Sequence, residues 1–276
     1  FLETTLTAAQ NFGIAHEALE ASELRQRFPQ FSLADGEVAY FERDAGYLKP
    51  EACIRAQLAL AERHGAAVHR DEQVLSVSPL PSGGVSVRTS GGTYAAEQAV
   101  VCAGAWLAKL LPQLAAKTQV TRQLLFWFGV EGSYPLFAPE RFPIFIWSFG
   151  TGSESGIYGF PAVDGAGGGI KVAASAYGLE FDPDGERRNA SEEEARSFYE
   201  SHIRTRIPAL ANQCMKSMMC LYTVTADSDF IVDRLPGAEQ IVAVSACSGH
   251  GFKHSAALGE NVSELMTGKQ IGRAHV

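Results

Sequence analysis

The sequence predicts a mixed α/β (α+β) protein with a meander beside a parallel strand and a separate antiparallel sheet. Apolar strand-like runs alternate with amphipathic helix-like segments along the chain, which is typical of mixed α/β architecture. Several other strand-like runs follow one another with only glycine-rich turns between them, which indicates antiparallel meanders. With 276 residues, 46% of them hydrophobic and 20% charged, the chain can bury a large core.

The first elements are predicted from capping residues and from proline. Ser22 is placed to cap a short helix that ends before Pro29, and residues 38–41 form a strand-like run. Pro50 suits the first turn of a helix, because its missing N–H would have no partner there, and Gly65 suits the end of that helix.

Glycine-rich turns divide the next part of the chain into short strands. The expected strands are residues 67–69, 74–77, 85–88, 94–95 and 99–102. The turns Pro-Ser-Gly-Gly and Ser-Gly-Gly between them predict a meander beside a parallel strand.

A longer aromatic strand and several shorter ones predict an antiparallel sheet. The expected strands are residues 120–130, 144–149, 156–160 and 170–174. Ser191 and Glu194 form an S-x-x-E capping box, so a helix is expected from there to about Ile203. The glycines of residues 165–169 are interpreted as a loop, because no helix follows them as it would in a phosphate-binding turn.

Charge and cysteine content exclude several function classes. The net charge of −8 and the pI near 5.4 argue against nucleic acid or an anionic membrane as the main partner. No apolar stretch approaches the roughly 20 residues of a membrane-spanning helix. The five cysteines show no C-x-x-C spacing, so a reducing compartment, the cytoplasm, is expected.

A glycine-rich turn lies between an apolar strand, residues 241–244, and an amphipathic helix. Its residues are Ser248-Gly249-His250-Gly251-Phe252-Lys253. Backbone N–H groups gather at such a helix N-terminus, and glycines allow a ligand to approach the main chain closely. Taken alone, the motif is either a ligand site or a tight strand-to-helix turn.

Other motifs accompany this turn in a characteristic order. They are Asp44-Ala45-Gly46-Tyr47-Leu48, Val100-Val101-Cys102-Ala103-Gly104-Ala105-Trp106, Tyr158-Gly159-Phe160-Pro161, Gly169-Ile170-Lys171, Cys220-Leu221-Tyr222-Thr223 and Asp227-Ser228-Asp229-Phe230-Ile231-Val232-Asp233. In this order and spacing the chain resembles the monomeric sarcosine oxidase and N-methyltryptophan oxidase family of FAD-dependent amine oxidoreductases, from its first residues to Gln270.

The resemblance implies a partial FAD-binding, Rossmann-like domain interleaved with an antiparallel-sheet substrate domain. The FAD-binding pieces would be residues 49–113 and 227–270, and the substrate domain residues 1–48 and 114–226. The family's first strand, GxGxxG motif and helix are not found in the sequence, so we expect a fragment. Residues 271–276 read as a sequence artefact.

The resemblance also implies where FAD binds. Cys220 corresponds to the residue that holds the flavin covalently, although a cysteine by itself is more often a small buried apolar residue. The other implied FAD contacts are Val74, Ala103, Gly104, Trp106, Gly249, Gly251, Phe252 and Lys253. No metal ligands are expected.

Five residues are implied to act on substrate or oxygen. Lys171 would favour reduction of O2, because a fixed positive charge stabilises a developing superoxide anion; a solvated lysine at a strand edge is the alternative. Lys253 would bind the substrate carboxylate. Tyr158 and Tyr222 would wall the amine pocket, where ring faces favour a substituted ammonium, and His250 would be a positioned loop residue beside the flavin.

Ser175 departs from the family, whose sarcosine oxidases have a histidine four residues after the active-site lysine. The expected substrate is a secondary amine or amino acid, and Ser175 leaves open whether it is sarcosine, a bulkier N-methyl amino acid, a cyclic imino acid or another secondary amine. The expected reaction is oxidation to an imine with O2 as acceptor, giving peroxide, by a protein that is monomeric when complete. Two alternatives stay open: a flavin-dependent amine dehydrogenase with a different electron acceptor, and a non-catalytic binding module on the same fold.

Overall fold

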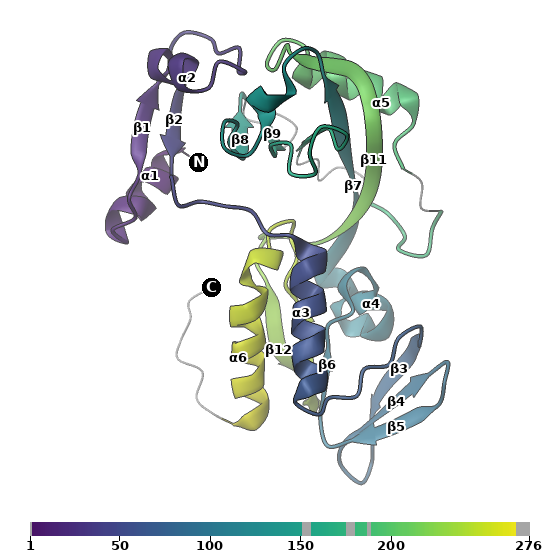
Figure 1. Ribbon diagram of the computed structural model, residues 1–276. Helices are drawn as coiled ribbons and strands as arrows, with labels where there is room; N and C mark the ends of the chain where they lie inside the picture. The colour runs from purple at the N-terminus through teal and green to yellow at the C-terminus, as the bar shows by residue number, and fades with distance from the viewer. Residues whose placement is uncertain (1, 151–155, 175–179, 187–188, 269–276) are drawn as a thin grey trace. The chain divides into compact units, whose positions relative to one another are not determined.

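The computed structural model describes residues 2–150, 156–174, 180–186 and 189–268 (Figure 1). The chain divides into two compact units. Unit 1 comprises Phe1–Tyr47, Gln123–Tyr177 and Glu186–Cys220, and unit 2 comprises Leu48–Arg122, Gly178–Gly185 and Leu221–Val276. Each unit therefore consists of three separate stretches of sequence.

Unit 1 begins with helix α1 (Leu2–Asn11), strand β1 (Glu17–Glu20), helix α2 (Ala21–Arg27) and strand β2 (Val38–Phe41). Strands β1 and β2 pair in antiparallel fashion. The prediction that Ser22 caps α2 was wrong, because the cap is Glu20, two residues earlier, and Ser22 lies inside the helix. Glu20 and Glu23 form a capping box, so a carboxylate stabilises the first turn in place of the serine hydroxyl.

The main part of unit 1 is a five-stranded sheet with the order β11-β7-β10-β9-β8. Its strands are β7 (Thr118–Val130), β8 (Phe145–Ser148), β9 (Gly156–Gly159), β10 (Ile170–Ala174) and β11 (Leu210–Thr225). Strand β10 is antiparallel to both β7 and β9, and β9 is antiparallel to β8, which confirms the expected sheet. The sequence did not predict β11, which supplies one edge.

One face of this sheet is covered within unit 1 by helix α5 (Glu192–Phe198) and the π-helical turn Tyr199–Ile203 that follows it. The Phe198 ring stacks on Phe126 of β7 at 4.6 Å. The predicted capping box is confirmed, because both reciprocal bonds between Ser191 and Glu194 are present. The core beneath α5 contains Phe126, Phe128, Ile157, Ile170, Val172, Ala195, Tyr199, Ile203, Ile207 and Leu210.

Unit 2 holds a three-stranded sheet with the order β12-β13-β6. Its strands are β6 (Ala99–Val101), β12 (Ile231–Leu235) and β13 (Ala238–Ser245), and its helices are α3 (Pro50–Arg63), α4 (Leu107–Leu110) and α6 (Ser255–Thr267). Strand β6 runs parallel to β13. The core contains Val85, Val101, Leu107, Leu111, Leu114, Leu235, Ile241 and Ala243.

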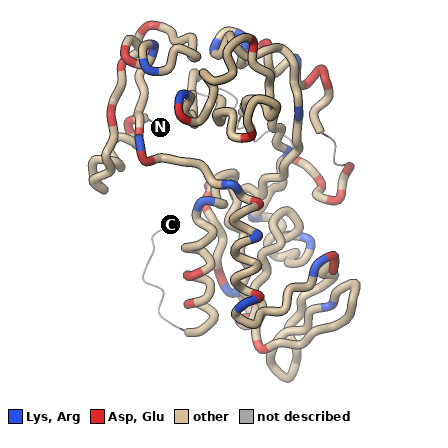
Figure 2. The backbone as a smooth tube through the Cα atoms, viewed as in Figure 1, with Lys and Arg blue, Asp and Glu red and all other residues tan. Residues whose placement is uncertain are grey.

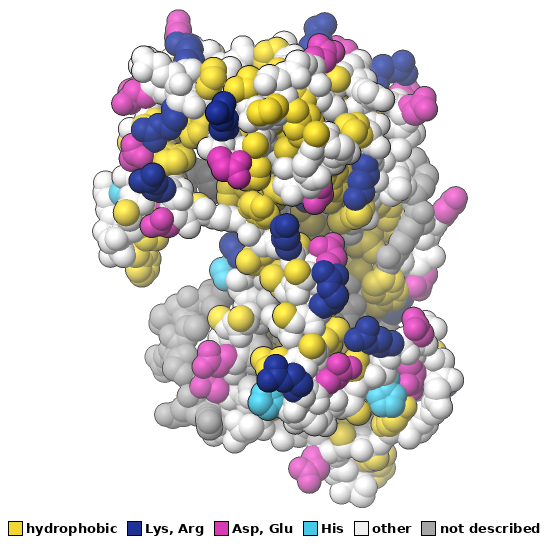
Figure 3. Space-filling view, in the orientation of Figure 1, with side chains coloured by type: hydrophobic (Ala, Val, Ile, Leu, Met, Phe, Trp, Pro, Cys, Tyr) yellow, Lys and Arg dark blue, Asp and Glu magenta, His cyan; other side chains and the backbone are white. Residues whose placement is uncertain are grey.

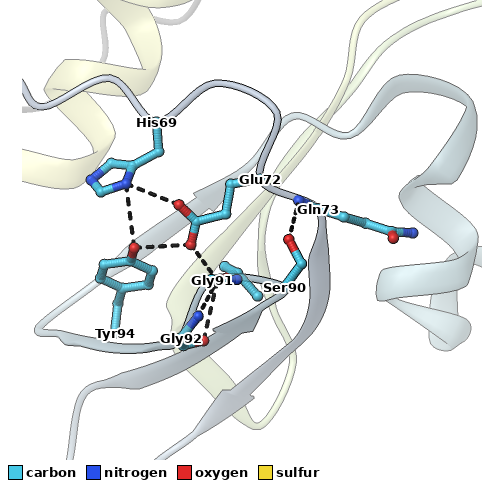
Figure 4. Close-up of polar contacts among 8 residues, drawn as sticks. His69, Glu72, Gln73, Ser90, Gly91, Gly92 and Tyr94 are labelled. Atoms are coloured by element: carbon cyan, nitrogen blue, oxygen red, sulfur yellow. Dashed lines mark hydrogen bonds and ion pairs between the residues drawn. The ribbon is translucent and has the colours of Figure 1, made fainter.

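The predicted meander is also in unit 2, as strands β3 (Val74–Pro79), β4 (Val85–Thr89) and β5 (Thr93–Ala96). The expectation of a further strand at residues 67–69 was wrong, since this stretch is irregular. The Glu72 carboxylate connects that stretch to the meander, accepting a hydrogen bond from Tyr94 at 2.9 Å and another from Thr89 (Figure 4). His69 lies 2.9 Å from the same carboxylate.

The two units divide at 47/48, 122/123 and 220/221, and residues 178–185 also belong to unit 2. The resemblance implied divisions at 48/49, 113/114 and 226/227. The assignment of FAD or substrate to these pieces stays a prediction. Residues 271–276 lie outside the described part of the chain.

Lys and Arg residues are interspersed with Asp and Glu residues along the backbone (Figure 2). No helix in the described residues is long and apolar enough to cross a membrane.

Candidate functional site

The sheet of unit 1 has a second face, opposite the one that α5 covers. Successive side chains of a strand point to opposite faces, so Lys171 and Ala173 of β10 alternate with the core residues Ile170 and Val172. On this second face the buried side chains Leu125, Trp127 and Ala173 form a small cluster, against which Tyr158 and Cys220 pack. We call this group, with Lys171, the thiol cluster.

Cross-strand register brings Lys171 into this cluster. Lys171 of β10 is paired with Trp127 of β7. Its Nζ lies 5.5 Å from the centre of the Trp127 ring and 4.8 Å from the centre of the Phe160 ring. A Lys ammonium within about 6 Å of an aromatic ring is attracted by the ring's negative face, so the two rings stabilise the charge of a half-buried lysine.

Cys220 is half-buried on β11. Burial raises the pKa of its thiol above the usual value, because a thiolate is poorly solvated there, while the positive charge of Lys171 acts in the opposite direction. The thiol and the ammonium are therefore electrostatically coupled. A flat ligand that reaches this face would meet both groups.

Tyr158 of β9 is paired with Ala173 of β10. Its ring lies 6.3 Å from Phe160 in an edge-on arrangement, and Phe160 lies 6.3 Å from Tyr47. Aromatic edges and faces thus extend from the thiol cluster toward Tyr47, which is 36% exposed. Figure 3 shows hydrophobic side chains at the surface over the elements of unit 1.

The glycine-rich turn lies in unit 2, between β13 and α6. Ser248 and Gly249 both have left-handed backbones, with φ of 40° and 77°, and for Gly249 this conformation costs little because it has no Cβ. At Gly251 a Cβ would come within 1.7 Å of the Ala246 carbonyl oxygen, so only glycine fits. Both predicted glycines are therefore required by the backbone of the turn itself.

Two side chains of the turn are held by backbone carbonyls. Lys253 donates from Nζ to the His250 oxygen at 2.7 Å, and desolvation lowers the pKa of the lysine. His250 lies with Nε2 2.9 Å from the Ser228 oxygen, and its ring stacks on Phe230 at 4.8 Å. Phe252 begins the short 3-10 helix Phe252–His254 that leads into α6.

The remaining predicted residues of unit 2 lie on other elements. Tyr222 is near the end of β11, next to the buried Thr223. Val74 begins β3 of the meander. Ala103, Gly104 and Trp106 follow β6, and the Trp106 indole donates to Asp184 at 2.7 Å. Ser175 lies outside the described residues.

The structure thus brings the predicted residues together in two groups. Lys171, Tyr158 and Cys220 meet on the sheet of unit 1, and Gly249, His250, Gly251, Phe252 and Lys253 share the turn of unit 2. Sequence reasoning missed Trp127, whose ring is the neighbour of Lys171. The sequence placed Trp127 inside the longest predicted strand, residues 120–130. Only the register of β7 and β10 shows that Lys171 is the residue next to it.

Comparison with known proteins identifies the family of the chain. The model of the FAD dependent oxidoreductase family (DAO) matches residues 1–265. Monomeric sarcosine oxidase of Streptomyces avermitilis is 37% identical over 263 residues, covering 95% of this chain and 67% of the relative. N-methyl-L-tryptophan oxidase of Salmonella heidelberg is 31% identical over 272 residues, covering 98% and 70%. The chain therefore spans about two thirds of the length of these relatives.

Solved structures show the same fold. NikD, described as an unusual amino acid oxidase essential for nikkomycin biosynthesis, superposes with a TM-score of 0.77 at 20% identity, over 98% of this chain and 70% of NikD. Glycine oxidase from Geobacillus kaustophilus gives a TM-score of 0.73 at 19% identity, over 96% and 66%. The chain belongs to the family of FAD-dependent oxidoreductases and is of the sarcosine and N-methyltryptophan oxidase type.

Proposed function

We propose that this FAD-dependent oxidoreductase oxidises a secondary amino acid, N-methyl or cyclic, with O2 as the electron acceptor, and that Cys220 holds the FAD covalently. The observation that carries the proposal is the thiol cluster, in which a thiol, an ammonium and flat aromatic rings share one face of a sheet. Two relatives that are named as oxidases of N-methyl amino acids, monomeric sarcosine oxidase and N-methyl-L-tryptophan oxidase, are similar over 95% and 98% of the chain.

The residues present fit a flavin. A sheet face with a half-buried thiol next to a lysine suits covalent attachment of a flat ring, since the neighbouring cation favours the reactive thiolate. In unit 2, Gly249 of the turn is exposed, so a ligand can approach its main chain, whereas Gly251 is buried. When bound, FAD would accept a hydride from the substrate carbon and pass the electrons to O2.

Lys171 supports the choice of O2 as acceptor. Its ammonium lies on the second face of the sheet, between two aromatic rings and close enough to Cys220 to alter the pKa of the thiol. In a site with little water, such a charge stabilises an anion formed from oxygen more strongly than it would in bulk solvent. Tyr158, on the same face, would contact the substituted ammonium of the substrate through its ring.

The turn of unit 2 would recognise the carboxylate of the substrate. Lys253 carries the charge for this, and its hydrogen bond to the His250 oxygen fixes the direction of its side chain. His250 itself is fixed by Ser228 and Phe230, so we assign it a positioning role. Tyr222 would contact the substrate amine. We further propose that the protein is monomeric and cytoplasmic, which size-exclusion chromatography and cell fractionation would check.

The covalent link is tested by acid precipitation of the protein after expression with FAD. We expect flavin in the precipitate of the wild type, on a peptide that contains Cys220, and free flavin in the supernatant of Cys220→Ser. Cys214→Ser is the matched control, because this second half-buried cysteine of β11 should not affect attachment. Flavin found only in the wild-type supernatant would refute the covalent link.

The acceptor is tested by measuring peroxide formed under air with N-methyl and cyclic amino acids. We expect one peroxide for each substrate oxidised. Lys171→Met should slow flavin reoxidation by O2 much more than flavin reduction by substrate. Substrate-dependent reduction without peroxide would favour the dehydrogenase, and bound flavin that no secondary amine reduces would favour a binding module.

A further inference from the structure

Ser248 is the buried centre of a hydrogen-bond network that joins the glycine-rich turn to the end of β11. It is 1% exposed, and Thr223 and Thr225 of β11 are 3% and 8% exposed. The Ser248 N–H donates to the Thr223 carbonyl at 2.9 Å. The Thr225 N–H donates to the Ser248 hydroxyl oxygen at 3.4 Å.

The same edge of β11 contacts the turn at two points. Thr223 donates from its N–H to the Cys247 sulfur at 3.4 Å, two residues before the contact of Thr225 with Ser248. N–H groups two residues apart on a strand point in the same direction. Side-chain atoms of Cys247 and Ser248 thus take the place that the backbone of a neighbouring strand would occupy.

The Ser248 hydroxyl both accepts and donates a hydrogen bond within this network. It donates to the Asp229 carbonyl at 3.2 Å, to which the Thr225 hydroxyl also donates at 2.8 Å. A buried hydroxyl costs stability unless such partners are present. Ser248 also has a φ of 40°, which an L-residue with a Cβ adopts only at a cost. Its hydrogen bonds stabilise a backbone conformation that would otherwise favour glycine.

We infer that Ser248 is a positioning residue, which holds the turn carrying His250 and Lys253 in register with the strand end carrying Tyr222. Only Gly249 lies between Ser248 and His250, and the amides of His250 and Gly251 both donate to the Cys247 carbonyl, at 2.8 and 3.0 Å. Loss of the Ser248 hydroxyl should therefore loosen these bonds first. The consequence for substrate depends on the proposed function, in which Lys253 binds a carboxylate.

The test is hydrogen exchange of individual amides in Ser248→Ala, Thr225→Val and the double variant. We expect exchange of the His250 and Gly251 amides to accelerate about fivefold in each single variant, the effect of one hydrogen bond of average strength. The double variant should show little more, because both changes break one network. Amides in the centre of β13 should be unaffected, which separates local loosening from general destabilisation.

Ser245→Ala is the matched control. Ser245 is 3% exposed, and its hydroxyl oxygen has no hydrogen-bond partner among the described residues, so exchange in the turn should not change. Three outcomes would overturn the positioning role. Amide exchange could accelerate equally in the turn and in β13, or the effects of the two substitutions could add in the double variant. Exchange in the turn could also stay unchanged in Ser248→Ala.

Acetate serves as a probe of the carboxylate site, followed by the NMR shift of the Gly249 amide. We expect Ser248→Ala to weaken acetate binding about fivefold and Ser245→Ala to leave it unchanged. Wild-type protein that binds no acetate would refute the proposed role of Lys253. The exchange experiment would still decide the role of Ser248, so the two failures are distinguishable.

Discussion

Cys220 and Lys171 influence each other through charge as well as through packing. Burial raises the pKa of the thiol, and the ammonium opposes that increase. A raised pKa means that less of the cysteine is thiolate at neutral pH, and only the thiolate is an effective nucleophile. The reactivity of Cys220 should therefore increase with pH and depend on the charge at position 171.

Lys171→Met should make Cys220 less reactive toward iodoacetamide at a given pH, since it removes the charge that lowers the thiol pKa. The measurement is alkylation rate against pH, by mass spectrometry of the Cys220 peptide. Cys102 is the internal control: the residue is exposed, partial desolvation raises the pKa of its thiol, and no charged neighbour contributes. A shift at Cys102 equal to that at Cys220 would contradict the proposed coupling.

The Cys220 motif could be recognised in the sequence, but its surroundings could not. A cysteine followed by Leu221, Tyr222 and Thr223 carried the resemblance to a flavin-linking site. That Trp127 shields the neighbouring lysine depends on the pairing of β7 with β10. Residues 44 positions apart acquire a common environment only through strand register, which local patterns do not determine.

Among the elements, the meander of unit 2 is stabilised by one carboxylate. Hydrogen bonds from Thr89 and Tyr94 lower the pKa of Glu72 below its usual value of 4.5 (Figure 4). The contact with His69 lowers it further, by a smaller amount. A carboxyl group whose pKa is lowered in the folded state stabilises the fold above the pKa of the unfolded state. This stabilisation disappears as the pH falls through the folded pKa.

Glu72→Gln should lower the thermal midpoint at pH 7, because the amide accepts these bonds less strongly than the charged carboxylate. The difference from wild type should shrink as the pH falls below 4.5, where the wild-type carboxyl also becomes neutral. Thermal unfolding between pH 3 and pH 7 measures both effects. Tyr94→Phe, which removes one hydrogen-bond donor to Glu72, should lower the thermal midpoint by less than Glu72→Gln does. If the lowering by Glu72→Gln did not depend on pH, the charge of Glu72 would not be its cause.

The capping box of α5 gives a second prediction for a single element. Ser191→Ala should lower the free energy of unfolding by about 1 kcal/mol, because it removes the bond that the Ser191 hydroxyl accepts from the Glu194 amide. Ser191→Thr should remain close to wild type, since a threonine hydroxyl can cap equally well. Denaturant unfolding measures both variants, and equal stability of Ala and wild type would show that the cap contributes nothing.

At the scale of the whole molecule, two strands belong to both units. β7 crosses the boundary between Arg122 and Gln123, and β11 crosses it between Cys220 and Leu221. Neither unit is a contiguous stretch of chain. Because unfolding one unit would remove part of both strands, we expect the units to unfold in one cooperative transition.

Tryptophan fluorescence can test this cooperativity, because unit 1 contains Trp127 and Trp147 and unit 2 contains Trp106. Trp106→Phe leaves reporters in unit 1 alone, and the double variant Trp127→Phe with Trp147→Phe leaves a reporter in unit 2 alone. Within each variant, fluorescence and far-ultraviolet circular dichroism should give the same denaturant midpoint. A fluorescence midpoint that differs from the circular dichroism midpoint would show that the units unfold separately.

The sequence by itself determined the local elements and the family. Pro50 marked the start of α3, Ser191 and Glu194 the start of α5, and glycines the turns, since these signals act within a few residues. It also contained the motifs around Cys220, Lys171 and Lys253. The tertiary structure alone decided that β11 forms an edge of the sheet, that Trp127 lies beside Lys171, and that Ser248 joins the turn to β11. These features arise from contacts between residues distant in sequence, whose pairing depends on how the whole chain packs.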